Sequence, residues 1–177
     1  MTLAMIPVGV TAPAEAVQAA PAAECTFSTP MHFSPGISPA DGTGLRYASD
    51  EDFTGAERGV VECIGTLGDP VTGPGTFGFT GVWSEGNCEA NKGSGRYSFT
   101  VPTTGGTKHF VGSYSEQRVG LDGTVTGTQP EGKFTGAFHI IPTGTLKNME
   151  TCQGKPITQA AIILTGLFVS GTAKATA

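Results

Sequence analysis

The chain has few charged residues, few basic residues and no long hydrophobic run, and each shortage argues against a class of function. Only 14% of its 177 residues are charged, and the ten lysines and arginines are spread along the sequence without forming a basic stripe. Binding to nucleic acid or to anionic lipid needs clustered basic residues, so the sequence predicts neither partner. The apolar runs at residues 3–10 and 162–169 are too short to cross a bilayer, which predicts no membrane span.

Sequence motifs of common catalytic and cofactor sites are also missing. The chain has no GxSxG nucleophile elbow, no GxxxxGK[ST] phosphate loop and no GxGxxG segment that opens a helix. Its histidines, His32, His109 and His139, are predicted on the outer faces of different strands, where they cannot converge on one metal ion. The sequence therefore predicts no catalytic residue, no cofactor and no metal, and it favours a protein that is not an enzyme.

Acidic residues offer two weaker candidate sites. The run Asp50–Asp52 could bind Ca²⁺ through carboxylate oxygens, but it lacks the glycine and the terminal glutamate of an EF-hand loop. A solvated acidic loop is the simpler interpretation. Glu62, Glu116 and Glu150 are loose candidates for a carboxylate pair that cleaves glycosidic bonds, and exposed acidic residues are the alternative.

Four cysteines are present: Cys25, Cys63, Cys88 and Cys152. An even number in an exported protein predicts two disulfides, for which three pairings are possible. We predict Cys25–Cys63, because both residues lie on neighbouring early strands. We predict Cys88–Cys152, because both lie in polar loops that could meet at one end of the sheet. Four buried free thiols are the alternative.

The first 24 residues are typical of a signal-peptide remnant followed by an Ala/Pro-rich extended segment. The apolar run at residues 3–10 precedes two small-x-small sites, at residues 14–16 and 17–19, although no Lys or Arg precedes residue 46. This pattern predicts a secreted, extracellular protein. Residues 11–24 are either a passive leader or an arm that lies on a partner protein. A single β domain is predicted over residues 25–177.

Glycine, in contrast, is abundant and occurs in a repeated pattern. The 27 glycines are roughly twice the usual share of about 7%. The pattern is clearest in Phe134-Thr135-Gly136-Ala137-Phe138, and weaker or stronger copies occur at residues 79–83, 110–114, 125–128 and 164–168. In a strand, each full copy places two large apolar residues on one face with a glycine between them. Such a glycine lets the strand bend or lets a bulky side chain come close, which predicts core strands of one strongly curved antiparallel sheet.

Alternation of apolar and polar residues predicts about eight or nine strands and no amphipathic helix. Pro30, inside the first strand, predicts an edge strand or a bulge. Residues 158–169 are apolar on both faces, which predicts a central strand covered on both sides. The predicted fold class is all-β: a strongly curved antiparallel barrel, with a two-sheet sandwich as the alternative.

Three aromatic residues are candidates for a binding surface. Trp83, Tyr97 and Tyr114 could form an aromatic platform or line the mouth of a cavity. Packing in the core is the alternative for all three.

Several segments of the chain carry a resemblance to a known group. These are Cys25-Thr26-Phe27, Phe33-Ser34-Pro35-Gly36, Gly75-Thr76-Phe77 and the repeat at residues 134–138. Over residues 25–170 the chain resembles small secreted glycine-rich β-domain proteins of filamentous actinobacteria. Its layout is also similar to that of the adaptor subunit of secreted umbrella toxin particles, in which a small disulfide-bonded β domain links a stalk protein to a lectin-like partner. That similarity implies a partner-binding role for residues 11–24, and it transfers no site residue.

Three functions follow as hypotheses. The first is a secreted, disulfide-stabilised, non-catalytic protein-interaction module, such as an adaptor in an extracellular toxin or surface assembly. The second is a barrel enzyme or a carrier of small apolar ligands, which needs an apolar cavity of several hundred Å³. The third is a secreted hydrolase inhibitor, which needs a rigid exposed loop near Cys88 or Cys152.

Overall fold

A computed structural model describes residues 23–130, 132–143 and 156–170 of the chain. Its described residues form strands and no helix, so none of them belongs to a helix that could cross a membrane. The strands are β1 (Ala23–Ile37), β2 (Arg46–Ala48), β3 (Gly59–Ile64), β4 (Thr66–Leu67), β5 (Asp69–Pro70), β6 (Gly75–Gly86), β7 (Ala90–Thr103), β8 (Gly106–Val119), β9 (Asp122–Gln129), β10 (Gly132–Pro142) and β11 (Ile157–Ser170).

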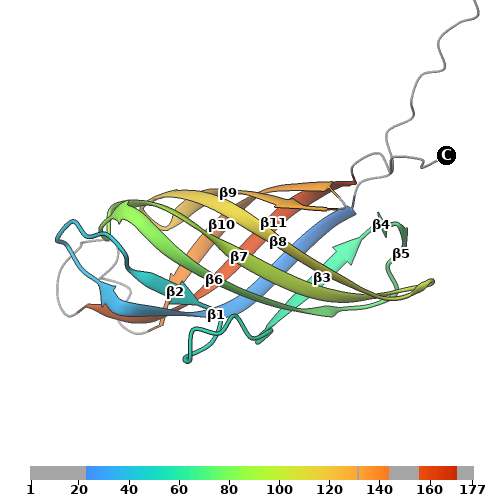
Figure 1. The fold of residues 1–177 in the computed structure, drawn as a ribbon, viewed down its shortest axis with the longest axis horizontal. Helices are drawn as coiled ribbons and strands as arrows, with labels where there is room; N and C mark the ends of the chain where they lie inside the picture. The colour runs from blue at the N-terminus through green and yellow to red at the C-terminus, as the bar shows by residue number, and fades with distance from the viewer. Residues whose placement is uncertain (1–22, 131, 144–155, 171–177) are drawn as a thin grey trace, which may run out of the picture.

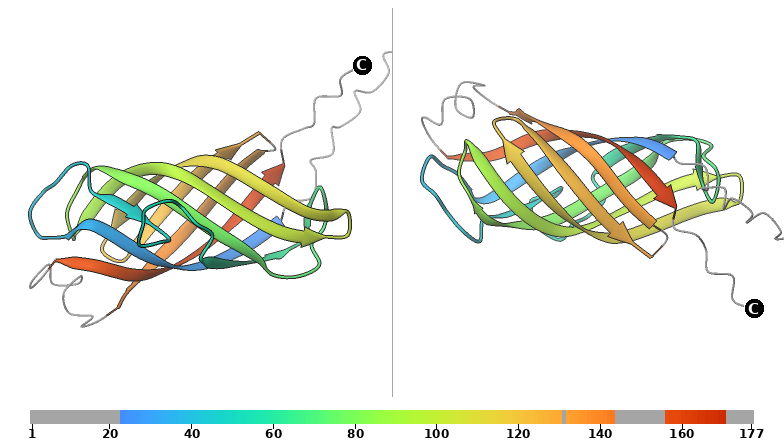
Figure 2. Two further views of the ribbon diagram at one scale, coloured as in Figure 1. Left: turned by 60° about the horizontal axis from the view of Figure 1, so that its bottom comes forward. Right: turned by 90° about the horizontal axis from the view of Figure 1, so that it is seen from above.

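Nine of these strands form one antiparallel sheet that closes on itself (Figure 1, Figure 2). Strands β6 to β11 pair in chain order, and β11 then pairs with β1. Between β1 and β6 lie two short strands, with β2 towards one end of the ring and β3 towards the other. The predicted all-β fold with a strongly curved antiparallel sheet is confirmed, and the strands form one closed ring rather than two facing sheets.

Inward-facing aromatic rings lie opposite glycines on neighbouring strands. The cross-strand pairs are Tyr47–Gly81, Trp83–Gly93, Tyr97–Gly112, Tyr114–Gly95, Tyr114–Gly127, Phe134–Gly127 and Phe138–Gly123. A methyl group on Gly112 would overlap the Tyr97 ring, and one on Gly166 would overlap the Phe134 ring. The ring therefore occupies the space above the glycine, as the repeated pattern predicts, and this pairing lets the sheet curve tightly around its contents.

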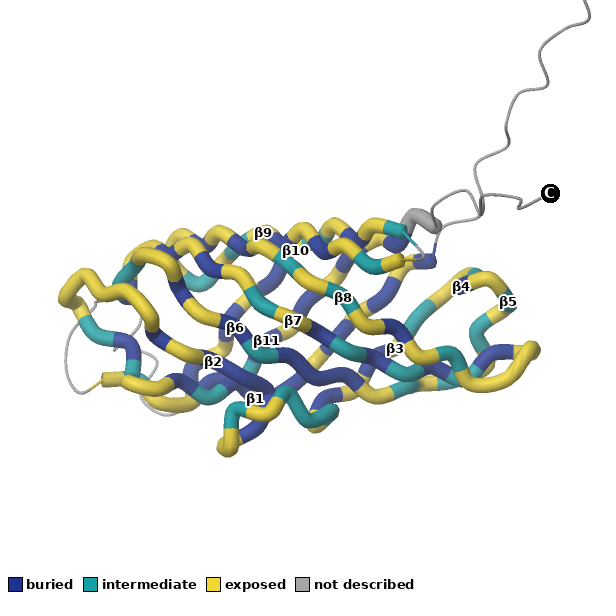
Figure 3. Tube along the Cα trace, in the orientation of Figure 1, coloured by how far each residue is buried: buried dark blue, intermediate teal, exposed yellow. Residues whose placement is uncertain are grey.

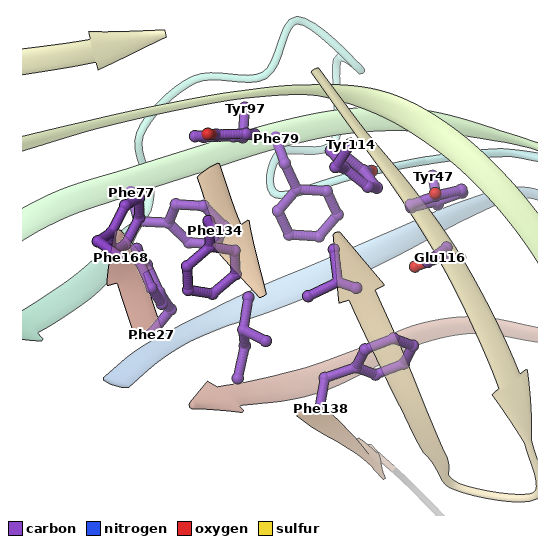
Figure 4. Close-up of a pocket in the computed structure, with 12 residues that line it drawn as sticks. Phe27, Tyr47, Phe77, Phe79, Tyr97, Tyr114, Glu116, Phe134, Phe138 and Phe168 are labelled. Carbon is purple, nitrogen blue, oxygen red and sulfur yellow. The ribbon is translucent and has the colours of Figure 1, made fainter. Parts of the chain in front are cut away.

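The interior of the closed sheet is nearly filled by side chains. Buried and exposed residues alternate along most strands, as the dark blue and yellow segments of Figure 3 show. Figure 4 shows the rings pointing into the interior, with Phe27, Phe77 and Phe168 gathered at one side and Tyr47 beside Glu116 at the other. The remaining cavity measures about 40 Å³, which holds a few water molecules at most.

One disulfide lies between β1 and β3. Cys25 and Cys63 are direct cross-strand partners, their Cα atoms are 4.0 Å apart, and their sulfur atoms are bonded. This is the first predicted pairing. Cys88 is not a free thiol, whereas Cys152, its predicted partner, lies outside the described residues.

Replacing both Cys25 and Cys63 by alanine is expected to lower the free energy of unfolding by about 3–4 kcal/mol. The disulfide joins residues 38 positions apart, and removing it restores the conformational freedom of that loop in the unfolded chain. Urea denaturation of both proteins measures the difference, and substitution rather than reduction leaves Cys88 untouched. Equal denaturation midpoints would show that the disulfide does not stabilise the closed sheet.

The predicted double covering of β11 is wrong, and so is the edge-strand alternative for β1. The outer face of β11 is not covered by any described residue, because the closed sheet is a single layer there, and Ile163 and Leu167 are 42% and 44% exposed. Strand β1 is not an edge strand, because it pairs with β11 on one side and with β2 and β3 on the other. Its pairing with β11 has a register irregularity between His32 and Ile37, beyond Pro30. Pro30 is tolerated because it falls between Ser28, the last residue paired with β3, and His32, the first residue paired with β2.

The predicted acidic loop is solvated only in part. Glu51 and Asp52 are exposed, but Asp50 is 5% exposed. The Asp50 carboxylate accepts hydrogen bonds from the backbone N–H groups of Thr54, Gly55 and Ala56 at 2.9, 2.7 and 3.1 Å, and from the Thr54 hydroxyl at 2.8 Å. Burial opposes ionisation, but these hydrogen bonds outweigh it and lower the pKa of Asp50. Asp50 therefore organises its own turn.

Candidate functional site

A groove of about 720 Å³ lies at one end of the closed sheet, and we call it the rim groove. It is formed where residues 41–43, the connection from β6 to β7 and the end of β8 meet. Its polar lining residues include Asp41, Thr43, Asn87, Lys92, Gln117 and Arg118. Ends of closed sheets are common positions for binding sites, so this groove is the main candidate in the described chain.

The groove is bordered by residues Asn87–Ala90, which we call the rim loop. The Asn87 N–H donates to the Ala90 carbonyl at 2.8 Å, and the Cys88 N–H donates to the Ser38 carbonyl at 3.2 Å. The Glu89 and Ala90 N–H groups both donate to the Asn87 side-chain oxygen, at 2.8 and 3.1 Å. All four N–H groups of this surface loop are thus satisfied within the protein.

The carbonyl groups of the rim loop are satisfied as well, and Arg118 holds two of them. Its Nη2 donates to the Asn87 carbonyl at 2.8 Å, and its Nη1 donates to the Cys88 carbonyl at 3.1 Å and to the Gly120 carbonyl. The Gly120 N–H donates to the Glu89 carbonyl at 2.7 Å, and the Ala90 carbonyl accepts from Asn87. Every backbone hydrogen-bonding group of the rim loop is therefore engaged, which fixes its shape.

Arg118 is a buried charge, 2% exposed, that belongs to a polar network inside the sheet. Its Nε donates to the Asn91 side-chain oxygen at 2.6 Å, and the Asn91 amide donates to Glu116 Oε1 at 3.0 Å. Trp83 Nε1 donates to the same carboxylate oxygen at 3.2 Å, and the Trp83 ring lies 5.2 Å below the guanidinium carbon. Burial lowers the pKa of Arg118 to about 10 and Glu116 opposes this, so Arg118 carries its charge at neutral pH.

Glu116 and two tyrosines form the inner side of this network. Burial raises the pKa of Glu116, and hydrogen bonds together with the charge of Arg118 offset this only in part. Burial, and then the charge of Glu116, raise the pKa values of Tyr47 and Tyr114. Tyr114 donates to the Thr80 carbonyl at 3.2 Å, while the Tyr47 hydroxyl is buried beside Tyr114 and Glu116.

The free energy of unfolding of the unsubstituted protein is expected to fall as the pH rises, because of Glu116. Replacing Glu116 by glutamine is expected to remove this contribution to the pH dependence. Because its pKa is raised in the folded state, the folded protein keeps a proton at pH values where the unfolded chain, with a pKa of about 4.3, has lost it. Stability then falls as the pH rises from about 4 through the folded pKa, and a glutamine does not titrate. Urea denaturation between pH 3.5 and 7 measures this slope for both proteins.

The matched control for this prediction is Glu62→Gln, which removes the same charge from an exposed glutamate on β3. Its slope is expected to follow that of the unsubstituted protein. If Glu116→Gln also keeps that slope, the buried carboxyl does not titrate with the folding equilibrium and the assignment is wrong.

The predicted aromatic residues lie inside the protein. Trp83 and Tyr97 are 1% and 8% exposed. Tyr97 and Tyr114 both line the small cavity, with ring centroids 6.4 Å apart, whereas Trp83 packs against Tyr47 at 6.3 Å and supports Arg118. The three side chains do not form one exposed platform.

The other candidates from the sequence do not come together. His109 lies 3.5 Å from Glu57, His139 lies 2.8 Å from Asp122, and both histidines are exposed on different strands. His32 is half-buried on β1. Within residues 23–130, 132–143 and 156–170, no three histidine, cysteine or acidic side chains form a group that could hold a metal ion.

The three glutamates that were candidates for a catalytic carboxylate pair do not come together in the described residues either. Glu62 lies on the outer face of β3, and Glu116 points into the sheet. Glu150 lies outside the described residues.

No family model, curated protein or solved structure matches this chain. The resemblance to actinobacterial β-domain proteins and to a toxin adaptor therefore stays a prediction.

Sequence reasoning missed Arg118 and Asn91, although a signal was present. In β8 the inward stripe of Phe110, Gly112 and Tyr114 continues at the same spacing into Glu116 and Arg118. Two opposite charges on the buried face of a strand indicate a buried polar network, because a buried charge needs compensating partners.

Proposed function

We propose that this protein is a secreted, disulfide-stabilised, non-catalytic module that binds another extracellular protein through the rim loop and rim groove. The observation that carries the proposal is the complete backbone hydrogen bonding of Asn87–Ala90, by groups of the loop itself, by the backbone of Ser38 and Gly120, and by the buried Arg118. The disulfide between Cys25 and Cys63 supports an oxidising, extracellular environment.

The cost of burying Arg118 favours a binding role for the loop. Removing a guanidinium from water costs several kcal/mol, which hydrogen bonds and a counter-charge must offset. Here its donors hold a surface loop and the adjoining turn at Gly120, rather than core side chains alone. A loop that is ordered before binding loses little conformational entropy when a partner docks, so its rigidity favours affinity and selectivity.

The test is co-purification from the supernatant of the producing culture, followed by mass spectrometry. Glu89 is an exposed residue of the rim loop, and its side chain can be changed without touching the backbone hydrogen bonds. We expect a protein that the unsubstituted chain retains and that Glu89→Arg loses. Glu62→Arg is the matched control, because it makes the same charge change on an exposed residue of β3 and should retain the partner.

A partner retained equally by all three proteins would place the contact elsewhere. Retention of no protein by the unsubstituted chain would contradict the interaction proposal. Titration of the purified partner with each variant then gives the ratio of the dissociation constants.

The adaptor hypothesis concerns residues 11–24 and is tested separately. Residues 11–22 lie outside the described part of the chain, whereas Ala23 and Glu24 already belong to β1 and Ala23 is fully buried. Deletion should therefore stop at residue 22. If the segment is a partner-binding arm, its deletion abolishes capture and leaves the melting temperature unchanged; equal capture by the truncated protein would exclude the arm.

A hydrolase inhibitor is the second candidate, because it needs the rigid exposed loop that Asn87–Ala90 provides. The two candidates differ in what the retained partner is. A retained hydrolase whose activity falls on addition of the protein, and recovers with Glu89→Arg, identifies an inhibitor. The carrier hypothesis has less support, since the interior cavity of about 40 Å³ is far below the several hundred Å³ it requires.

A further inference from the structure

A second groove, of about 220 Å³, lies on the outer wall of the closed sheet over β2, β6 and β7. Arg46 and Arg96 line it, and both side chains are exposed. Strand β6 runs between them, since Arg46 pairs with Val82 and Arg96 pairs with Thr80. Strands that flank a common neighbour are roughly 10 Å apart, so two arginine side chains can reach a ligand held between them.

Neither arginine has an ion-pair partner within the described residues. Lys92 and Lys108, by contrast, lie 2.7 Å from Glu85 and from Asp69. The chain carries a formal net charge of −5, so two unpaired guanidinium groups in one groove are notable. A guanidinium presents parallel N–H groups that match the two oxygens of a carboxylate, sulfate or phosphate.

Phe53 fixes the position of one of these arginines. It is the one non-glycine residue with a positive φ in the described chain, at 58°, a conformation that costs about 1 kcal/mol or more. The turn begun by Asp50 holds it there, because the Phe53 N–H donates to the Asp50 carbonyl at 3.3 Å. The Arg46 guanidinium carbon lies 4.9 Å from the centre of the Phe53 ring, so this guanidinium is oriented at the wall of the groove.

Asp50, Glu51 and Asp52, the acidic residues of this turn, form no ion pair with either arginine within the described residues. The Asp50 carboxylate is directed into its own turn, where it accepts hydrogen bonds from Thr54, Gly55 and Ala56. Thr80, the cross-strand partner of Arg96, and Ser94 also line the groove.

We propose that this groove binds the oxyanion of an acidic polysaccharide, either a carboxylate or a sulfate group. Two arginines supply the recognition of the anion, and Thr80 and Ser94 provide polar contacts for sugar hydroxyl groups. The volume suits a single sugar residue rather than a large ligand. A nucleic acid fits less well, because two arginines on an acidic protein do not form the extended basic surface that a phosphate backbone requires. The site is separate from the rim groove.

Binding is measured by isothermal titration calorimetry at low ionic strength, with dextran sulfate, polygalacturonate and neutral dextran as probes. We expect binding to at least one acidic polymer and none to dextran, and the polymer that binds identifies sulfate or carboxylate as the anion. Arg46→Gln/Arg96→Gln is expected to weaken binding at least tenfold. Arg96→Gln alone, which leaves the contact of Arg46 with Phe53 in place, should weaken it severalfold.

The matched control is Arg58→Gln/Lys133→Gln, which removes two exposed positive charges that do not line the groove. It should stay within about twofold of the unsubstituted protein, since only distant, screened charges change. Equal weakening by both double variants would indicate non-specific attraction and overturn the proposal. Failure of the unsubstituted protein to bind either acidic polymer would overturn it as well.

Discussion

Replacing Gly81 and Gly166 together by valine is expected to lower the free energy of unfolding by about 4 kcal/mol or more, or to prevent folding. Side-chain atoms at Gly81 would overlap the ring of Tyr47, and those at Gly166 would overlap the ring of Phe134. Overpacking a dense interior costs about 1–3 kcal/mol per site, and the two sites do not face the same ring, so their effects add. Urea denaturation followed by circular dichroism measures the loss.

The control for this prediction is Thr135→Val/Thr165→Val. These exposed residues lie one position away from Gly136 and Gly166 on β10 and β11, and their side chains face outwards. Their replacement is expected to change stability by no more than about 0.5 kcal/mol. If both double variants have the same stability, the inward glycines do not make room for the rings.

Replacing Arg118 by methionine is expected to lower the free energy of unfolding by about 3–5 kcal/mol. The variant leaves the carbonyls of Asn87 and Cys88 without their donor, and it leaves Glu116 buried without a nearby positive charge. Methionine keeps most of the apolar volume, so the loss reports the hydrogen bonds and the charge. Urea denaturation at pH 7 measures it.

Two further variants show whether the geometry of Arg118 matters. Arg118→Lys keeps a positive charge but not the planar set of donors, so it should restore only part of the stability. Arg58→Met removes an exposed arginine elsewhere and should have little effect. Full stability in Arg118→Lys would mean that charge alone, rather than the hydrogen bonds to the rim loop, supports the fold.

The closed sheet could be predicted because its cause is local. In a repeat such as Phe134-Thr135-Gly136-Ala137-Phe138, the two phenylalanines predict which face of the strand is buried. The glycine between them predicts where an aromatic ring packs against the strand. Alternation of apolar and polar residues predicted about eight or nine strands, and nine strands form the closed sheet. The Cys25–Cys63 disulfide could be predicted because both cysteines lie on neighbouring strands early in the chain.

Features that depend on contacts between distant segments could not be predicted. The space beside β1 is shared by β2 and β3, and this arrangement explains why Pro30 can lie within a paired strand. The outer face of β11 is apolar, and nothing in the described chain covers it. The composition of the strand therefore led to the wrong prediction that both of its faces are buried. A local pattern shows which residues face the same way, but not what lies opposite them.

The candidate site was harder to predict than the fold. The sequence predicts that Cys88 lies in a polar loop, and that a hydrolase inhibitor would use a rigid exposed loop near this residue. It does not show that Arg118, 30 residues later, donates to the carbonyl of Cys88. Glu116 appeared only as a loose catalytic candidate, whereas the structure gives it a part in a buried network with Trp83 and Asn91.

Hydrogen exchange of the rim-loop amides tests the central claim most directly. The proposed function requires a surface loop that is held rigid from within, and slow exchange is the observable sign of such order. We predict that the amides of Cys88, Glu89 and Ala90 exchange as slowly as those of the adjoining strands β6 and β7, and that Arg118→Met exposes them under conditions where it remains folded. Exchange of these three amides at the rate of an unstructured peptide in the unsubstituted protein would contradict the account.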